Sequence, residues 1–330
     1  MRRVVLLALA ACACSEEVLT AGATEPIRVY DARLKEAARF KSGELPGKRP
    51  LTDAEIAQGV KPATPNITSL IKQNGTTFAG ATGKEFTGRA SPTAATVAIG
   101  FEDAGSGYWL VPTGSPDPNN NGELEFHVTV DFGDGVPTGT QHLRFVALDE
   151  KGRAGTQLRE ELCVAPLVPD NLNACRATIE PPALVVSLDW DRPVDLDLQV
   201  VTPDGKVVDP KHPSTAPSGG DGGIPTPLPP DVGVLDRDSN GGCFIDGHQL
   251  ENLVFQEKPA KGHYLVYANL FDSCGEPAVH FGLSFHASEA GKKPGTFQVV
   301  ETYRTSGELL RIHENGGSHL GLYVTEFDSK

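Results

Sequence analysis

The sequence predicts an all-β protein built from two β-sandwich domains. Gly and Pro are frequent, with 36 and 26 among 330 residues, and 39% of residues are hydrophobic, which suits a turn-rich folded chain. Short runs of alternating apolar and polar residues recur between turn signals such as Asn74-Gly75 and Lys151-Gly152. The length leaves room for two domains of ordinary size.

Residues 1–11 have the pattern of an export signal. Two arginines precede a short apolar stretch, and residues 9–12, Leu-Ala-Ala-Cys, resemble the lipobox of bacterial lipoproteins, in which the cysteine is acylated and becomes the new N-terminus. The apolar stretch is much shorter than the roughly 20 residues of a membrane-spanning helix. The resemblance implies a lipid anchor at Cys12, and Ala13 implies the outer membrane. A plain secretory signal cut near Cys14 is the alternative.

Residues 12–65 are polar and lack hydrophobic periodicity, so we expect a mostly unstructured tether. Residues 30–41 have a helical pattern, and so do residues 52–58, where Thr52 or Asp53 would cap the helix. Neither segment has a second amphipathic element nearby to pack against.

Residues 66–165 are expected to form an immunoglobulin-like sandwich, because about seven short strands alternate with turn signals. The expected strands are 68–72, 76–79, 95–101, 107–111, 123–132, 142–148 and 157–164. A linker at 166–182 then leads to the second domain.

Residues 183–330 are expected to form the second sandwich. Strict alternation near its start predicts a half-buried strand, with Asp195 and Asp197 on one face and Leu196 and Leu198 on the other. The Pro/Gly/Ser-rich stretch 210–230 has no hydrophobic periodicity and is expected to be a flexible insertion. The later strands are expected at 250–256, 262–271, 279–286, 296–305, 308–313 and 321–327.

Acidic and amide side chains cluster in this domain. Asp195 and Asp197 repel each other unless a positive charge lies between them. A second dense group follows, with Asp236, Asp238 and Asn240. Hard oxygen ligands at this density suit calcium, which takes about six to eight oxygens. A solvated acidic strand edge followed by an Asx-rich turn is the alternative.

The same region resembles the YfaP-like bacterial domain, a β-sandwich family carried on secreted proteins. The resemblance covers about residues 183–290 and rests on WDxxxDLDLQVVTPDG, LDRDSN, GxxLENLVF and GHYLVYANLF. It implies a β-sandwich and a bound cation, and it places Glu251 and Asn252 beside the aspartates. Two departures are Gln199, where the family has histidine, and the insertion 210–230. The matching positions are Trp190, Asp195, Asp197, Pro203, Gly205, Asp236, Asp238, Glu251 and Asn252.

Cys12 and Cys14 belong to the anchor region, and the four remaining cysteines allow three pairings. The simplest joins Cys163 to Cys175 and Cys243 to Cys274. Disulfides persist in oxidising compartments such as the periplasm or the cell exterior, which agrees with export.

Charge and motifs narrow the function. A net charge of −14 argues against nucleic acid as a partner and against purely electrostatic binding to acidic lipid. The sequence lacks the common hydrolase and phosphate-loop motifs. Neighbouring carboxylates on one strand face cannot flank a sugar from opposite sides, as glycoside hydrolysis requires.

We therefore expect a non-enzymatic, lipid-anchored protein of the cell envelope that contacts a protein or glycan partner. The alternative is a metal-dependent hydrolase acting on an extracellular polymer. A wide cleft with a third carboxylate opposite Asp195 and Asp197 would favour the hydrolase. Closed, oxygen-only coordination at the base of a loop would favour the binding role.

Overall fold

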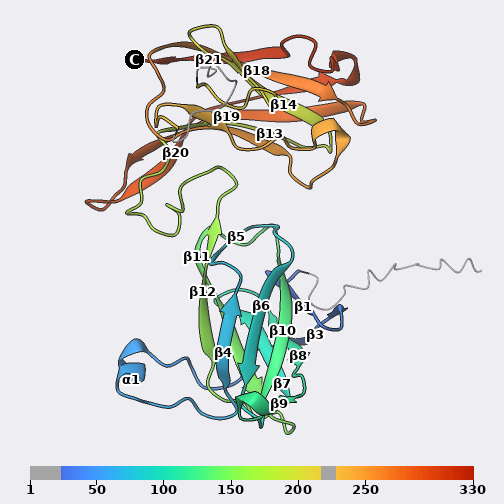
Figure 1. Cartoon of the computed structure of the whole chain (residues 1–330), viewed down its shortest axis with the longest axis vertical. Helices are drawn as coiled ribbons and strands as arrows, with labels where there is room; N and C mark the ends of the chain where they lie inside the picture. Colours follow the sequence, from blue (N-terminus) through green and yellow to red (C-terminus); the bar gives the residue numbers. More distant parts are fainter. Residues whose placement is uncertain (1–23, 217–227) are drawn as a thin grey trace, which may run out of the picture. The chain divides into compact units, whose positions relative to one another are not determined.

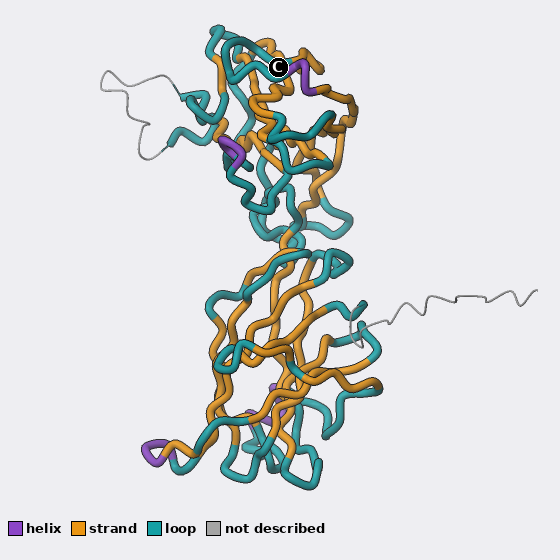
Figure 2. Tube along the Cα trace, turned by 90° about the vertical axis from the view of Figure 1, so that its right-hand side faces the viewer, coloured by secondary structure: helices purple, strands orange, loops and turns teal. Residues whose placement is uncertain are grey.

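The computed structural model describes residues 24–216 and 228–330 and confirms the all-β fold class. The chain forms two compact units, drawn mainly from residues up to 160 and from residues 161–330 (Figure 1). The short segments 74–81 and 134–142 group with the second unit. Each unit consists mainly of strands joined by loops (Figure 2).

One sheet of the N-terminal part has the strand order β2-β1-β10-β6-β4, and β9 pairs with β10. The strands are β1 Ile27–Asp31, β2 Glu36–Ala37, β4 Ile67–Lys72, β6 Lys84–Ala90, β9 Pro116–Asp117 and β10 Glu123–Phe132.

The other sheet has the order β3-β8-β7-β11-β12-β5, with β12 and β5 parallel. Between the sheets, Phe145 of β11 contacts Phe86 of β6 and Phe126 of β10, with ring centroids 5.6 and 6.4 Å apart. The strands are β3 Arg39–Ser42, β5 Thr76–Phe78, β7 Thr96–Phe101, β8 Gly107–Pro112, β11 Gly139–Leu148 and β12 Leu158–Ala165.

Every strand expected in 66–165 is present to within a few residues, but the two-residue β9 and the seven-residue β6 were not foreseen. Strand β6 is the longer of the two. Its inward side chains include only one large apolar residue, Phe86. At Gly88 an added Cβ would lie 2.3 Å from the Phe126 ring. Gly88 therefore leaves room for the Phe126 ring. Because a glycine stands where an alternating pattern would have a large apolar residue, the sequence does not show the strand.

The prediction of an unstructured tether over 12–65 is wrong from residue 27 onward. Strand β1 pairs with β10, and Ile27 and Val29 are buried in the core. The helix expected at 30–41 is also wrong, because β2, β3 and a turn occupy that stretch. Asp31 stabilises the turn by accepting a hydrogen bond from the Arg33 backbone nitrogen at 3.0 Å, a local bond that competes with helix formation.

The helix expected at 52–58 is confirmed as α1, Asp53–Ala57. Thr52 is its N-cap and forms a capping box with Glu55, so local sequence alone specifies this helix. Residues 1–23, with the expected signal and Cys12, lie outside the described residues.

The C-terminal unit contains a five-stranded sheet, β16-β17-β13-β19-β20, and a four-stranded sheet, β15-β14-β18-β21. Figure 1 shows them as two layers, with β13, β19 and β20 in one and β14, β18 and β21 in the other. The strands are β13 Leu184–Trp190, β14 Asp195–Val201, β15 Val207–Val208, β16 Gly233–Leu235, β17 Leu250–Phe255, β18 Gly262–Asp272, β19 Ala278–Ala290, β20 Phe297–Leu310 and β21 Leu322–Ser329.

The expected strands of this unit are largely confirmed, except that 296–305 and the first half of 308–313 form one long strand, β20, and Arg311–His313 form a 3-10 turn, η3. The core between the layers is made of alternating residues from both sheets, and Leu196, Leu198 and Val200 of β14 point into it.

The flexible insertion expected at 210–230 is wrong for its first part. Ser214 and Ala216 are buried, and Ser214 forms a β-bridge with Val234. The Lys206 ammonium group donates a hydrogen bond to the Ala216 carbonyl oxygen. Residues 210–216 therefore pack on the sandwich, and residues 217–227 lie outside the described part of the chain.

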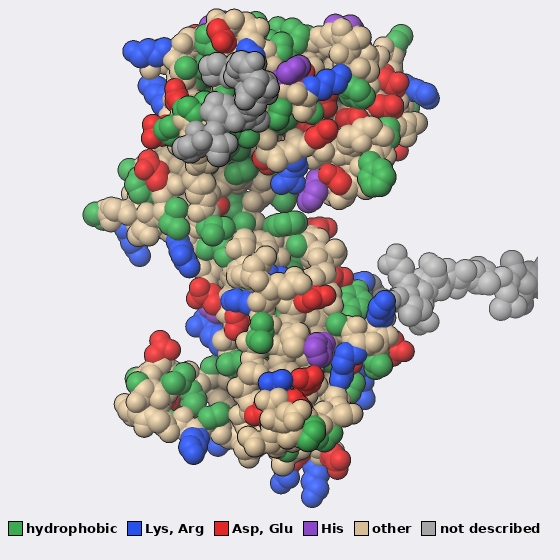
Figure 3. Space-filling model, viewed as in Figure 1, with side chains coloured by type: hydrophobic (Ala, Val, Ile, Leu, Met, Phe, Trp, Pro, Cys, Tyr) green, Lys and Arg blue, Asp and Glu red, His purple; other side chains and the backbone are tan. Residues whose placement is uncertain are grey.

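Both expected disulfides, Cys163–Cys175 and Cys243–Cys274, are formed. The simplest of the three pairings is the one adopted, and the two bonds fit an extracellular protein. No helix within residues 24–216 and 228–330 is long and apolar enough to cross a membrane. On the face drawn in Figure 3, acidic and basic side chains are interspersed with hydrophobic ones.

Candidate metal centre

The site is built on strand β14. Alternation directs Leu196 and Leu198 into the core and Asp195 and Asp197 to the opposite face, as expected. The expectation of a half-buried strand is wrong, however, because Asp195 and Asp197 are only 2% and 6% exposed. A cavity of about 140 Å³ lies over this face of the strand. Its lining residues are Asp195, Asp197, Gln199, Asp209, Pro210, Lys211, Asp238, Gly241, Gly242, Phe271 and Gly317.

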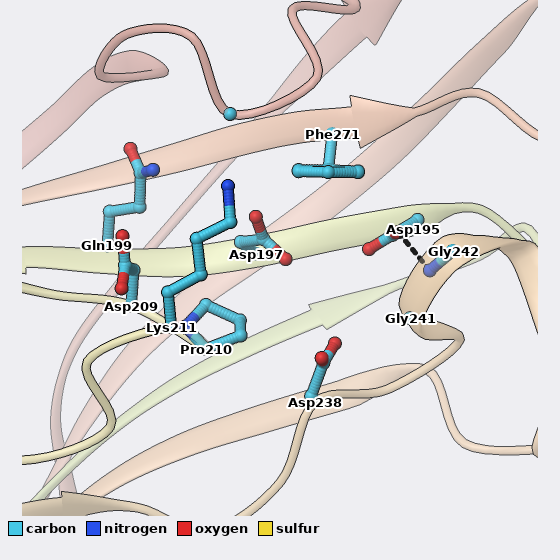
Figure 4. Close-up of a pocket in the computed structure, with 11 residues that line it drawn as sticks. Asp195, Asp197, Gln199, Asp209, Pro210, Lys211, Asp238, Gly241, Gly242 and Phe271 are labelled. Carbon is cyan, nitrogen blue, oxygen red and sulfur yellow. Dashed lines mark hydrogen bonds between the residues drawn. The ribbon is translucent and has the colours of Figure 1, made fainter.

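Three of the predicted ligands converge on this cavity. One carboxylate oxygen from each of Asp195, Asp197 and Asp238 lies within 4.8 Å of the others. Figure 4 shows Asp195 and Asp197 projecting from β14, with Asp238 approaching from the neighbouring loop. Two buried carboxylates and one exposed carboxylate thus face a common point.

Hydrogen bonds hold the two buried aspartates in place. The backbone nitrogen of Gly242 donates to Asp195 Oδ2 at 2.6 Å. The Asn269 side chain donates to Asp197 Oδ2 at 3.1 Å, and Asn315 in turn donates to Asn269 Oδ1 at 2.5 Å. Gly242 belongs to η2, Gly241–Cys243, and has a φ of 60°, a conformation that glycine adopts without strain.

Burial and mutual repulsion make these carboxyl groups hard to ionise. Burial raises the pKa of Asp195 to about 6, and the charges of Asp238 and Asp272 add to the effect. Burial and the neighbouring Asp195 raise the pKa of Asp197 to about 7. Burial and Asp246 also raise the pKa of Asp238. A cation between the carboxylates would relieve both causes.

The other four predicted ligands use their side chains to build the loop beside the cavity. Asp236 accepts hydrogen bonds from the backbone and side-chain nitrogens of Asn252, both at 2.9 Å. The Asn240 side chain donates to the carbonyl oxygens of Val194 and His248, and its Oδ1 accepts from the Asp246 nitrogen. These residues connect the loop to the strands on either side.

Glu251 is fully buried and completes the edge of β14. Its Oε2 accepts from the Leu198 nitrogen at 2.7 Å, and its Oε1 accepts from the Ser239 nitrogen at 3.2 Å. Strand β15 pairs with β14 only at Val200 and Val201. The Glu251 carboxyl group therefore supplies the hydrogen-bond acceptor that a neighbouring strand would otherwise give to the Leu198 nitrogen. Burial raises the pKa of Glu251 well above its ordinary value. We assign Glu251 and Asn252 to the support of the site.

Asp209, Asn269 and Lys211 were not predicted as site residues. Asn269 lies directly opposite Asp197 in the β14–β18 register, so only the strand pairing reveals it. Asp209 lines the cavity and raises the pKa of Asp197 by its charge. The Lys211 ammonium group also lines the cavity, 5.3 Å from the centre of the Phe271 ring. Asp209 and Lys211 follow the short strand β15, which the sequence pattern did not predict.

The arrangement fits calcium in size and chemistry. Two oxygens bound to one calcium ion at roughly 2.3–2.6 Å lie at most about 5 Å apart, and the three carboxylate oxygens meet that limit. The donors are all oxygen, which favours a hard cation over zinc or copper. A second group, Cys243, Asp272 and Cys274, offers no thiolate because its cysteines are disulfide-bonded.

Comparisons with known proteins give no family. No family model matches the chain, and no curated protein matches it. A solved structure described as manganese lipoxygenase of Gaeumannomyces graminis with a partial structure of zonadhesin of Komagataella pastoris is 12% identical. The match covers 80% of this chain and 96% of that chain, with a TM-score of 0.19, too low to carry an argument about fold or function. The YfaP-like resemblance thus stays a prediction.

Proposed function

We propose that this chain is an exported, lipid-anchored binding or structural protein whose C-terminal unit holds a calcium ion between Asp195, Asp197 and Asp238. The observation that carries the proposal is the convergence of these carboxylates within 4.8 Å while two of them are almost fully buried. Placing charged groups together out of water is costly unless a counter-charge is present.

Further oxygens for calcium are available at the cavity. Asp209 contributes a fourth carboxylate to its lining, although its Oδ1 also accepts a hydrogen bond from the His212 nitrogen. Because calcium takes about six to eight oxygens, water molecules would complete its shell. Asn269, Gly242 and Glu251 would orient the ligands without contacting the ion, as supporting residues do in metal sites.

The size of the cavity favours binding over catalysis. Its volume of about 140 Å³ is below the range of roughly 300–1,000 Å³ typical of sites for small-molecule substrates. A polymer substrate would require an open groove at the carboxylates. We therefore infer that an ion at this site is structural rather than the catalytic metal of a hydrolase.

Export is supported by the two disulfides, and the lipid anchor by the lipobox-like residues 9–12. The outer membrane is proposed because Ala13 follows Cys12. As part of the same proposal, the anchored protein contacts a protein or glycan partner.

The test is calcium titration of the chelator-stripped full chain by isothermal titration calorimetry, with melting curves in calcium and in chelator. We expect one ion per chain and a higher melting temperature in calcium. Stabilisation should be about 2.7 kcal/mol when free calcium is 100 times the dissociation constant. Identical melting curves in calcium and chelator, together with no binding heat, would show that the carboxylates hold no ion.

A further inference from the structure

Exposed apolar side chains lie close in sequence to residues that line the acidic cavity. Phe244 is 85% exposed and Ile245 is 51% exposed, and they directly follow η2, which donates the Gly242 hydrogen bond to Asp195. Ile312 in η3 is also 85% exposed. Phe244 and Ile245 are consecutive residues in a loop with glycine at 241, 242 and 247, so they protrude from the surface at a loop tip.

A chain of contacts places these loops at one end of the C-terminal unit. The Cys243–Cys274 disulfide joins the η2 loop to the turn after β18. In that turn, Ser273 donates a hydrogen bond to Glu314, which directly follows η3. Asn315 connects the same segment to Asn269, which contacts Asp197.

The net charge at this end of the C-terminal unit determines whether it attracts or repels a charged partner. The cavity is lined by four aspartates and a single basic residue, Lys211, so this end is acidic without a bound ion. An anionic surface would then be repelled. A bound calcium ion would offset part of that charge and present a positive centre beside Phe244 and Ile245. Three carboxylates leave several coordination positions for other oxygens.

We infer that this end of the C-terminal unit docks on an anionic phospholipid surface in the presence of calcium. The inference rests on the proposed calcium site. Headgroup phosphate oxygens replace water molecules in the coordination shell of the ion, and Phe244 and Ile245 enter the boundary between headgroups and acyl chains, where apolar side chains gain from burial. A lipid surface fits better than a glycan, because Phe244, Ile245 and Ile312 offer no hydrogen-bonding groups to sugar hydroxyls.

Vesicle co-sedimentation tests this inference. The full chain would carry Cys12→Ala, so that an acyl anchor cannot cause binding. Vesicles of phosphatidylcholine with about one quarter phosphatidylglycerol would be compared with pure phosphatidylcholine, each in calcium and in chelator. We expect binding only with phosphatidylglycerol and calcium together. Phe244→Ser with Ile245→Ser should weaken binding by about tenfold or more, because two apolar side chains are removed.

The matched control is Leu34→Ser with Ile71→Ser, which removes side chains that are 59% and 67% exposed in the N-terminal unit. This variant should bind vesicles like the wild type. Calorimetry without vesicles should give the same calcium affinity for both double variants. Retained vesicle binding by the Phe244/Ile245 variant would overturn the inference.

Three other outcomes overturn it in different ways. Calcium binding without vesicle binding rejects lipid docking and leaves the calcium site intact. Absence of calcium binding rejects the proposed function itself. Calcium-dependent dimerisation, measured by light scattering and abolished by the Phe244/Ile245 substitutions, would assign the same surface to a second copy of the chain.

Discussion

The N-terminal and C-terminal units each contain a loop rich in Asp and Asn. The surroundings of the carboxylates shift their pKa in opposite directions in the two regions. In the N-terminal unit, Asp117 Oδ1 accepts a hydrogen bond from the Asn119 nitrogen at 2.9 Å, and Oδ2 accepts from the Asn120 side chain at 2.5 Å. Arg89 lies 3.7 Å away. These hydrogen bonds, chiefly that from Asn120, lower the pKa of Asp117.

In the C-terminal unit, burial and like charges raise the pKa of Asp195, Asp197 and Asp238. Asp117 is the single carboxylate of residues 115–121, whereas oxygens of these three carboxylates lie within 4.8 Å of one another at a shared cavity. A cation site therefore depends on whether the local backbone and side chains already satisfy the carboxylate oxygens.

Substitution of the ligands should give the largest difference between the two regions. Asp195→Asn together with Asp197→Asn should weaken calcium binding by about a hundredfold or more, because two charged ligands become neutral. Asp117→Asn should change the affinity by less than about twofold, since that carboxylate is already paired. Calorimetric titration of each variant measures both effects. Equal losses in the two variants would contradict the assignment of the site.

Removal of the disulfides should give the next largest difference. Each bond should contribute about 3–4 kcal/mol to the free energy of unfolding through the unfolded state. Cys243→Ser with Cys274→Ser should also weaken calcium binding by about tenfold, because the bond restrains η2 and its Gly242 nitrogen beside Asp195.

The matched variant is Cys163→Ser with Cys175→Ser. It should lose comparable stability in denaturant unfolding, yet its calcium affinity should stay at the wild-type value. A fall in calcium affinity in this variant would show that general loosening, rather than the position of η2, controls the site.

The pH dependence should give the smallest difference. The pKa of Asp197 is raised from 3.8 to about 7, so between these values the folded state binds more protons than the unfolded state. The contribution of Asp197 to stability therefore falls as the pH rises through this window. In chelator, the melting temperature of the wild type relative to Asp197→Asn should drop by a few degrees from pH 5 to pH 8.

Calcium should reverse this trend, because the ion binds the ionised carboxylates and its affinity rises with pH. Asp117 provides the contrast. Because the pKa of its carboxyl group is lowered, its contribution to stability is present above pH 4 and is lost in acid, and Asp117→Asn removes this contribution. A wild-type chain whose melting temperature follows that of Asp197→Asn at every pH in chelator would show that Asp197 does not resist ionisation.

Sequence alone determined the features that depend on local pattern. Alternation in β14 placed Leu196 and Leu198 in the core and the two aspartates opposite, because side chains of a strand alternate between faces. Thr52 specified α1 because a capping box is a short-range signal. Cysteine spacing and context indicated the pairings that the structure adopts.

Only the tertiary structure decided which acidic residues form the site. Glu251, Asp236 and Asn240 looked like ligands in sequence, but each satisfies backbone or side-chain groups of neighbouring segments. Asn269 reaches Asp197 through a strand pairing 72 residues distant in the chain. Burial of Asp197 likewise comes from segments that pack over its strand. Hydrogen-bond partners and solvent access arise from long-range packing, so the chemical state of a carboxylate is not encoded in its immediate neighbours.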